Sequence, residues 1–135
     1  MPRLSVWFLR AALLYLAAGI TIGSLLLSHK AFPINPYLWV LLPTHIEFLL
    51  FGWTVQVVMG VSYRMLPRFT GANARGNEGL AWCALIFLNL GVVFAGLGPV
   101  VAGSAPLILF GKASELAGAV FFVLHAWARV KPVGV

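Results

Sequence analysis

Five ionisable side chains lie inside apolar stretches of the sequence, where they could do chemistry. His45 and Glu47 lie in one apolar run, and a second run holds Lys112, Glu115 and His125. A titratable group in such an environment is costly, so it needs a partner or carries a function. These five residues are therefore the first candidates for a functional site.

His45 heads a stripe of small and polar residues on one face of a predicted helix. On a helical wheel, the stripe falls within about 40° and consists of His45, Gly52, Gln56, Met59 and Tyr63. It offers a ligand-capable side chain, a glycine that allows close approach, and polar groups below it, as a flat cofactor would need. The alternative is a helix–helix contact in which His45 bonds to a neighbouring carbonyl group.

Glu47 lies about 200° around the helix from His45, so it faces away from this stripe. Lys112 lies about two turns inside its own run, at a depth comparable to that of Glu47. A Glu47–Lys112 ion pair is the simplest account of the two charges. Lys112 could also pair with Glu115 along its own helix, at i, i+3. The alternative to these structural pairs is a proton path.

The composition indicates a membrane protein. Of 135 residues, 61% are hydrophobic and 9% are charged, whereas a soluble domain carries about 25% charged residues. The mean hydropathy is +0.99. These values exclude a disordered chain, and a single cysteine excludes a disulfide-rich secreted domain. The net charge of +6 comes from basic residues at the ends of apolar runs, which favours topology signals over a nucleic-acid-binding face.

Four apolar runs are long enough to cross a bilayer, which takes about 20 residues of helix. They cover residues 6–28, 37–66, 79–101 and 105–128, and short connections join them. Short loops make sequential helices neighbours. The predicted fold is therefore an all-α integral-membrane antiparallel four-helix bundle, which forms a single domain over residues 1–135.

The basic residues predict how this bundle is oriented in the inner (cytoplasmic) membrane, because Lys and Arg are enriched in cytoplasmic flanks. Only Lys30 flanks the predicted outer side. The seven basic residues that flank the other side are Arg3, Arg10, Arg64, Arg68, Arg75, Arg129 and Lys131. Both termini are therefore predicted to be cytoplasmic.

The remaining histidines and the cysteine are weaker candidates. His45 lies about 12 Å below the outer end of its helix and His125 about 30 Å below the outer end of its own, so the two cannot easily bind one iron within a single chain. We expect His29 to be solvated at an outer helix end and Cys83 to be inert packing. The sequence has no CxxC, CxxCH, HExxH, P-loop or nucleophile-elbow motif.

The segment PTHIEFLLFGWTVQVVMGVSYRMLPRF has a specific order of residue types. These are His45, Trp53, Met59, Gly60, Tyr63 and Pro67. In this order the segment resembles the second transmembrane helix of the large subunit of heme-copper oxidases and nitric-oxide reductases. The chain as a whole is similar to small stand-alone membrane proteins described as cytochrome c oxidase subunit I-like, through the helices LRAALLYLAAGITIG and GKASELAGAVFFVLHAWARV.

The resemblance implies heme b as the cofactor. In the large subunit the second-helix His is an axial ligand of the low-spin heme, and that role falls on His45. A full oxidase subunit has many more helices and a binuclear copper site built from several His, whereas this chain has three His in all. Oxygen or nitric-oxide reduction by that centre is therefore excluded. Many small relatives have His-x-His where this chain has His45-Ile46-Glu47.

Three functions stay open from the sequence. The first is a b-type heme protein for electron transfer or diatomic-gas binding, with a respiratory-chain protein or quinol as partner. Its heme is either five-coordinate or shared by a homodimer through His45 of each chain, with propionates near Lys30 or His29. The second is a cofactor-free accessory or assembly subunit of a respiratory oxidase complex. The third is an ion or proton path through Glu47, Lys112 and Glu115. Whether the protein is an enzyme stays undecided, and no nucleic-acid partner is expected.

Overall fold

The computed structural model describes residues 1–101 and 105–130, and within them the chain forms helices joined by turns and loops, without β-strands. The predicted connection at 102–104 and Lys131 lie outside these residues. In chain order the elements are α1 (Arg3–Ala31), the 3-10 helix η1 (Pro36–Leu41), α2 (Leu42–Glu47), the π-helix η2 (Phe48–Val55), α3 (Gln56–Met65), α4 (Glu78–Leu97) and α5 (Ala105–Trp127).

The elements η1 to α3 form one continuous helical span, Pro36–Met65, whose winding changes along its length. The Asn35 side chain caps its start by accepting a hydrogen bond from the backbone N–H of Tyr37. Farther along, the Thr54 hydroxyl donates to the carbonyl of Leu49, five residues back, within the segment wound as a π-helix. A π-helical turn inserts an extra residue into the helical repeat, so it rotates the residues before it relative to those after it.

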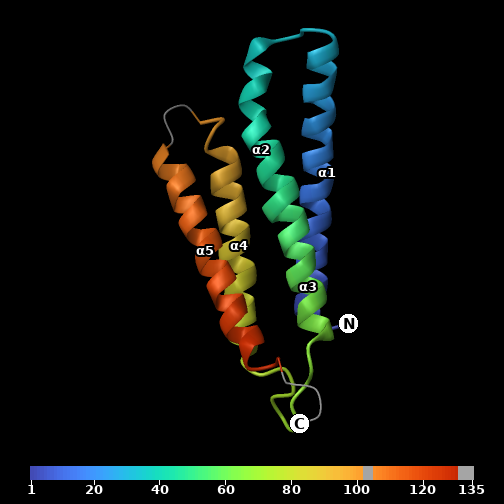
Figure 1. Cartoon of the computed structure of the whole chain (residues 1–135), viewed down its shortest axis with the longest axis vertical. Helices are drawn as coiled ribbons and strands as arrows, with labels where there is room; N and C mark the ends of the chain where they lie inside the picture. Colours follow the sequence, from blue (N-terminus) through green and yellow to red (C-terminus); the bar gives the residue numbers. More distant parts are fainter. Residues whose placement is uncertain (102–104, 131–135) are drawn as a thin grey trace.

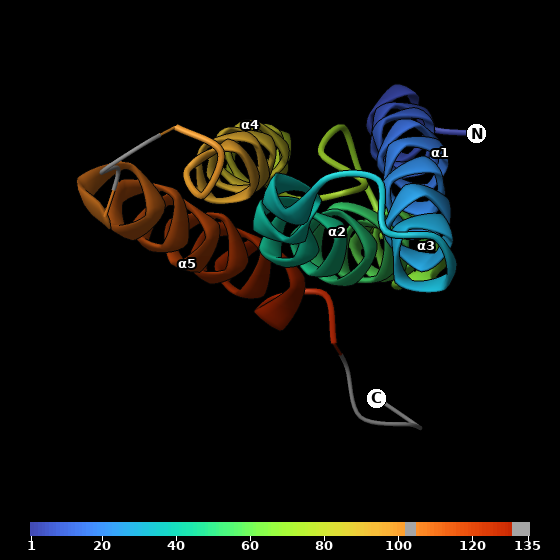
Figure 2. The same ribbon diagram turned by 90° about the horizontal axis from the view of Figure 1, so that it is seen from above.

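Four helices are long and apolar enough to cross a membrane, as a multi-pass membrane protein requires. They run antiparallel as two hairpins (Figure 1). One hairpin is α1 with the Pro36–Met65 span, and the other is α4 with α5. Seen from above, the Pro36–Met65 span lies in the middle, between α1 and the second hairpin (Figure 2). The spans and their order are thus as the sequence predicts.

Small residues let the helices approach closely. In the second hairpin, a Cβ atom on Gly111 would lie 2.4 Å from the backbone nitrogen of Ala95, and one on Gly118 would lie 2.8 Å from that of Leu88. In the first hairpin, a Cβ atom on Gly19 would lie 2.7 Å from a methyl carbon of Leu49. Gly19 and Gly23, which have GxxxG spacing on α1, are therefore used for packing within the chain.

The helix ends differ from the predicted ones by a few residues, for identifiable reasons. The first helix continues through the polar residues Ser28–Lys30 to Ala31, because the first helix-breaking residue is Pro33. The third helix ends at Leu97 and not at 101. Pro99 follows shortly after, and a proline has no backbone N–H to donate into the helix.

The two hairpins have unequal heights. The α1 helix has 29 residues and α4 has 20, so α1 is longer by about 13 Å at 1.5 Å per residue. At the end that holds the N-terminus, the α3–α4 loop and the end of α5, the hairpins are nearly level (Figure 1). At the opposite end, the tip formed by α1 and η1 therefore extends beyond the end of α4.

Candidate functional site

His45 lies against α1, close to the level where α4 ends. Its Nδ1 is 2.7 Å from the carbonyl oxygen of Gly19. A carbonyl oxygen only accepts, so Nδ1 carries the proton, and in the neutral ring Nε2 keeps a free lone pair. The ring rests on Gly23, where a Cβ atom would lie 2.5 Å from its Cε1. The predicted alternative of a bond to a neighbouring carbonyl is confirmed, and such a bond is also what metal-binding histidines make.

An open groove of about 250 Å³ lies beside His45, on the extended part of the first hairpin. Its walls are apolar except for His45 and Lys30. Among the residues that the structure describes, none hydrogen-bonds to Nε2 of His45, so this nitrogen is available to a ligand. The groove is lined by Gly23, Leu26, Leu27, Lys30, Trp39, Leu42 and His45.

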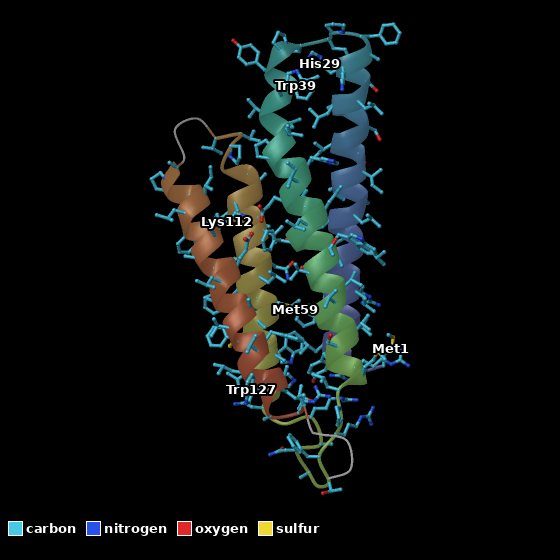
Figure 3. The ribbon with its side chains drawn as sticks, in the orientation of Figure 1. Met1, His29, Trp39, Met59, Lys112 and Trp127 are labelled. Carbon is cyan, nitrogen blue, oxygen red and sulfur yellow. The ribbon has the colours of Figure 1, made fainter. Side chains whose placement is uncertain are left out.

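The other residues of the predicted stripe lie in the bundle interior. Gly52 lies against the ring of Tyr15, and Gln56 is fully buried, with Nε2 3.4 Å from both the Phe8 carbonyl and the Asn89 side chain. Met59 lies between the two hairpins (Figure 3). These side chains are packed against protein, and none of them lines the groove beside His45.

The predicted stripe lies against α1 as far as Gln56. His45 and Gly52 contact α1 at Gly23 and Tyr15, and the Gln56 side chain reaches the Phe8 carbonyl. Tyr63, farther along, stacks on His125 of α5. The eight π-helical residues lie between His45 and Gln56, and a wheel with 100° per residue does not represent them.

His125 and Arg129 form a second polar cluster, at the opposite end of the bundle. His125 donates from Nδ1 to the carbonyl of Asn77, 3.0 Å away, and accepts at Nε2 from Arg129, 3.1 Å away. Its ring stacks on that of Tyr63. Burial lowers the pKa of the Arg129 guanidinium below its usual value, but arginine starts so high that it stays charged at neutral pH. Both His125 nitrogens are engaged, so this ring has no free lone pair.

The prediction that His29 is solvated is wrong. His29 is 6% exposed, and its Nδ1 accepts hydrogen bonds from the backbone N–H groups of Ile34 and Asn35, at 2.9 and 3.3 Å. Its ring meets that of Trp39 edge to face, at the tip of the hairpin (Figure 3). The turn folds back over the helix end because its backbone N–H groups need acceptors. The closely spaced Pro33 and Pro36 are the sequence signal for this tight reversal.

Both predicted ion pairs of Lys112 are present at once. The Lys112 Nζ is 2.5 Å from Oε2 of Glu47 and 3.2 Å from Oε2 of Glu115. Figure 3 shows Lys112 in the upper half of α5, beside the first hairpin. The ammonium group also lies 4.5 Å from the centre of the Phe51 ring, a cation–π contact. We call Glu47, Lys112 and Glu115 the charged triad.

Two further features bear on possible ligand sites. A hollow of about 940 Å³ lies within the α3–α4 loop, at the end of the bundle away from His45. Within the described residues, no three His, Cys, Asp or Glu side chains are grouped to hold a metal ion.

Comparison with known proteins adds no relative. No family model, no curated protein and no solved structure matches the chain.

Proposed function

We propose that the chain is a b-type heme-binding membrane protein in which Nε2 of His45 is an axial ligand of the iron. The observation that carries the proposal is the hydrogen bond from Nδ1 to the Gly19 carbonyl. It fixes the tautomer and the orientation of the ring, and raises the basicity of Nε2. Neutral imidazole is a common axial ligand of heme iron.

The groove beside His45 fits part of a heme. Its apolar wall, Leu26, Leu27 and Leu42, suits a porphyrin face, and Lys30 provides a cation for a propionate. Its volume of about 250 Å³ is below the usual ligand-site range of about 300–1,000 Å³. One chain therefore provides one wall of the site, and a second surface must close it.

A second copy of the chain is the closing surface that we propose. Near the groove, Leu27 is 69% exposed and Trp39 is 46% exposed, and α4 ends below this part of the hairpin. Two such faces, related by a twofold axis, would enclose one heme between the His45 residues of both chains.

When bound, the heme would supply reversible one-electron chemistry or a binding position for a diatomic gas. The residues of the chain would have three tasks. His45 holds and orients the group, Lys30 compensates a propionate, and the leucines and Trp39 exclude water. A respiratory-chain protein or quinol would be the electron partner.

The stoichiometry and spectrum of heme test the proposal. The protein is expressed with ample heme, purified in detergent, and analysed by a heme assay and a reduced-minus-oxidised spectrum. We expect half a heme per chain and a sharp low-spin spectrum. One heme per chain, with a high-spin ferrous form that binds carbon monoxide, would instead indicate a five-coordinate heme held by a single chain. A colourless, folded protein would overturn the proposal.

The second candidate is a cofactor-free accessory or assembly subunit of a respiratory oxidase complex. The observation that favours it is the interior packing of Gly52, Gln56 and Met59, which leaves the stripe fully used by helix–helix contacts. This candidate predicts the colourless protein, so the same spectrum separates the two.

We also propose that the bundle lies in the inner membrane with both termini in the cytoplasm, because Arg64, Arg68 and Arg129 gather at the end of the bundle where α1 begins and α5 ends. The test uses single cysteines in a Cys83→Ser background, labelled in intact cells with an impermeant maleimide. Asn35→Cys should react, and Ala72→Cys should react only after the cells are permeabilised. The reverse labelling pattern would show that the orientation in the membrane is opposite to the proposed one.

A further inference from the structure

The two carboxyl groups of the charged triad lie deep in the bundle, whereas the Lys112 side chain is 44% exposed on the surface of α5. Glu115 is the eleventh of the 23 residues of α5, so it lies near the middle of that span. Glu115 is 4% exposed and Glu47 is 7% exposed. Since one nitrogen contacts Oε2 of both, at 2.5 and 3.2 Å, the two carboxyl groups lie within about 6 Å of one another.

The charges of the triad do not balance if every group is ionised. Lys112 contributes one positive charge and the two glutamates contribute two negative charges, which leaves a net charge of −1 in an apolar environment. An uncompensated charge of this kind is costly, and two carboxylates that share a site do not both ionise readily. A single bound proton would make the triad neutral.

The hydrogen-bonding pattern independently supports the presence of one bound proton. Oε1 of Glu47 and Oε1 of Glu115 are both buried, and neither has a hydrogen-bond partner among the described residues. Buried polar atoms are almost always satisfied, so each unsatisfied one requires an explanation. If one of the two carboxyl groups is protonated, its O–H becomes a hydrogen-bond donor. It can then donate to the neighbouring carboxylate or to a water molecule.

No other described charged group compensates the triad. From α4, the backbone of Gly91 packs against the Glu115 side chain, and the nearby polar residue on that helix is the neutral Asn89. From η2, the Phe51 ring lies against the ammonium group of Lys112. Tyr15 on α1 packs against Phe48 and not against the carboxyl groups.

We propose that the triad is a proton-binding site that holds one exchangeable proton at neutral pH, shared between Glu47 and Glu115 and located mainly on Glu115. Glu47 makes the shorter contact to Lys112 and is the carboxylate of the ion pair. Glu115 has the longer contact and the greater burial, so it is the group that remains neutral. The proposal is independent of heme.

The sequence makes this site accessible to infrared spectroscopy. The chain has no Asp and three Glu, of which Glu78 lies at the start of α4 outside the triad. The experiment records the carbonyl stretch of protonated carboxylic acid in the full chain at pH 7, in H₂O and in D₂O. We expect one such band in the wild type, with an isotope shift that identifies an exchangeable proton.

Three variants assign the band. Glu115→Gln and Glu47→Gln should each abolish it, because the remaining glutamate then pairs with Lys112 and ionises. Lys112→Met should roughly double it, because both carboxyl groups lose their counter-charge. Glu78→Gln is the matched control and should leave it unchanged.

The wild-type measurement alone can overturn the inference, so it does not depend on the folding of any variant. Absence of an isotope-sensitive carboxylic-acid band at pH 7 would show that the triad is fully ionised. A band that persists in both Glu47→Gln and Glu115→Gln would place the proton elsewhere.

Discussion

His45→Ala is expected to abolish heme binding while leaving the helical bundle intact. The variant removes the only described imidazole whose Nε2 has a free lone pair. Loss of an axial ligand should weaken heme binding by at least about 100-fold, because even the loss of a group that hydrogen-bonds to a metal ligand costs about 10–100-fold. The cost to stability should stay near 1 kcal/mol, which is typical of one hydrogen bond. The measurement is the heme-to-chain ratio after purification, together with the circular dichroism signal at 222 nm.

Two other variants make this test specific. Gly23→Ala keeps His45 but adds a methyl group 2.5 Å from its Cε1, so the ring must move and heme should also be lost. His125→Gln should keep heme, because that ring is already engaged at both nitrogens. If the shared site is correct, His45→Ala also weakens the dimer in sedimentation experiments. Full heme content in His45→Ala would contradict the proposal, whether the heme is five-coordinate or shared by two chains.

Arg129→Met is expected to lower the free energy of unfolding by about 3–5 kcal/mol. Arg129 is 1% exposed, and it donates to the carbonyls of Leu66 and Pro67, at 2.8 and 3.1 Å. These carbonyls follow the end of α3, so the guanidinium joins the end of one hairpin to the end of the other. Each buried acceptor left without a donor costs about 1–3 kcal/mol, and His125 Nε2 is the third acceptor to lose its partner.

The comparison series for Arg129 uses thermal unfolding in one detergent. Arg129→Lys should recover only part of the loss, because an ammonium group lacks the planar fork that reaches several acceptors. Arg68→Met, at an exposed position of the adjoining loop, should stay within about 0.5 kcal/mol of the wild type. Equal losses in Arg68→Met and Arg129→Met would show that general charge removal, and not the buried hydrogen bonds, determines stability.

The sequence predicts those parts of the structure that depend on local pattern. Spans follow from the length of apolar runs, and the Glu47–Lys112 pair follows from comparable depth on two helices. The interior position of Gln56 and Tyr63 also follows from their common face. These predictions hold because helical periodicity and the cost of buried charge act almost independently of the tertiary structure.

The missed features all depend on how elements meet. The stripe below His45 was expected to offer a face to a cofactor, but Gly52 is covered by Tyr15, and Gln56 is bonded to Phe8 and Asn89 of neighbouring helices. His29 was expected in solvent because the folding back of the turn residues is a tertiary event. Arg129 was interpreted as a topology signal, although its spacing of four residues from His125 indicates a pair on one helix face.

The unequal heights of the two hairpins affect how the protein fits its bilayer. The 20 residues of α4 match a hydrocarbon thickness of about 30 Å, whereas the 29 residues of α1 span about 44 Å. Helix tilt reaches about 40° at most in known structures, and α1 would need slightly more than this to fit within 30 Å. The extra length of α1 therefore extends into the headgroup regions, because a bilayer is about 40–45 Å thick when these are included. The polar residues Ser28–Lys30 lie in the last turns of α1, which suits them to that polar layer.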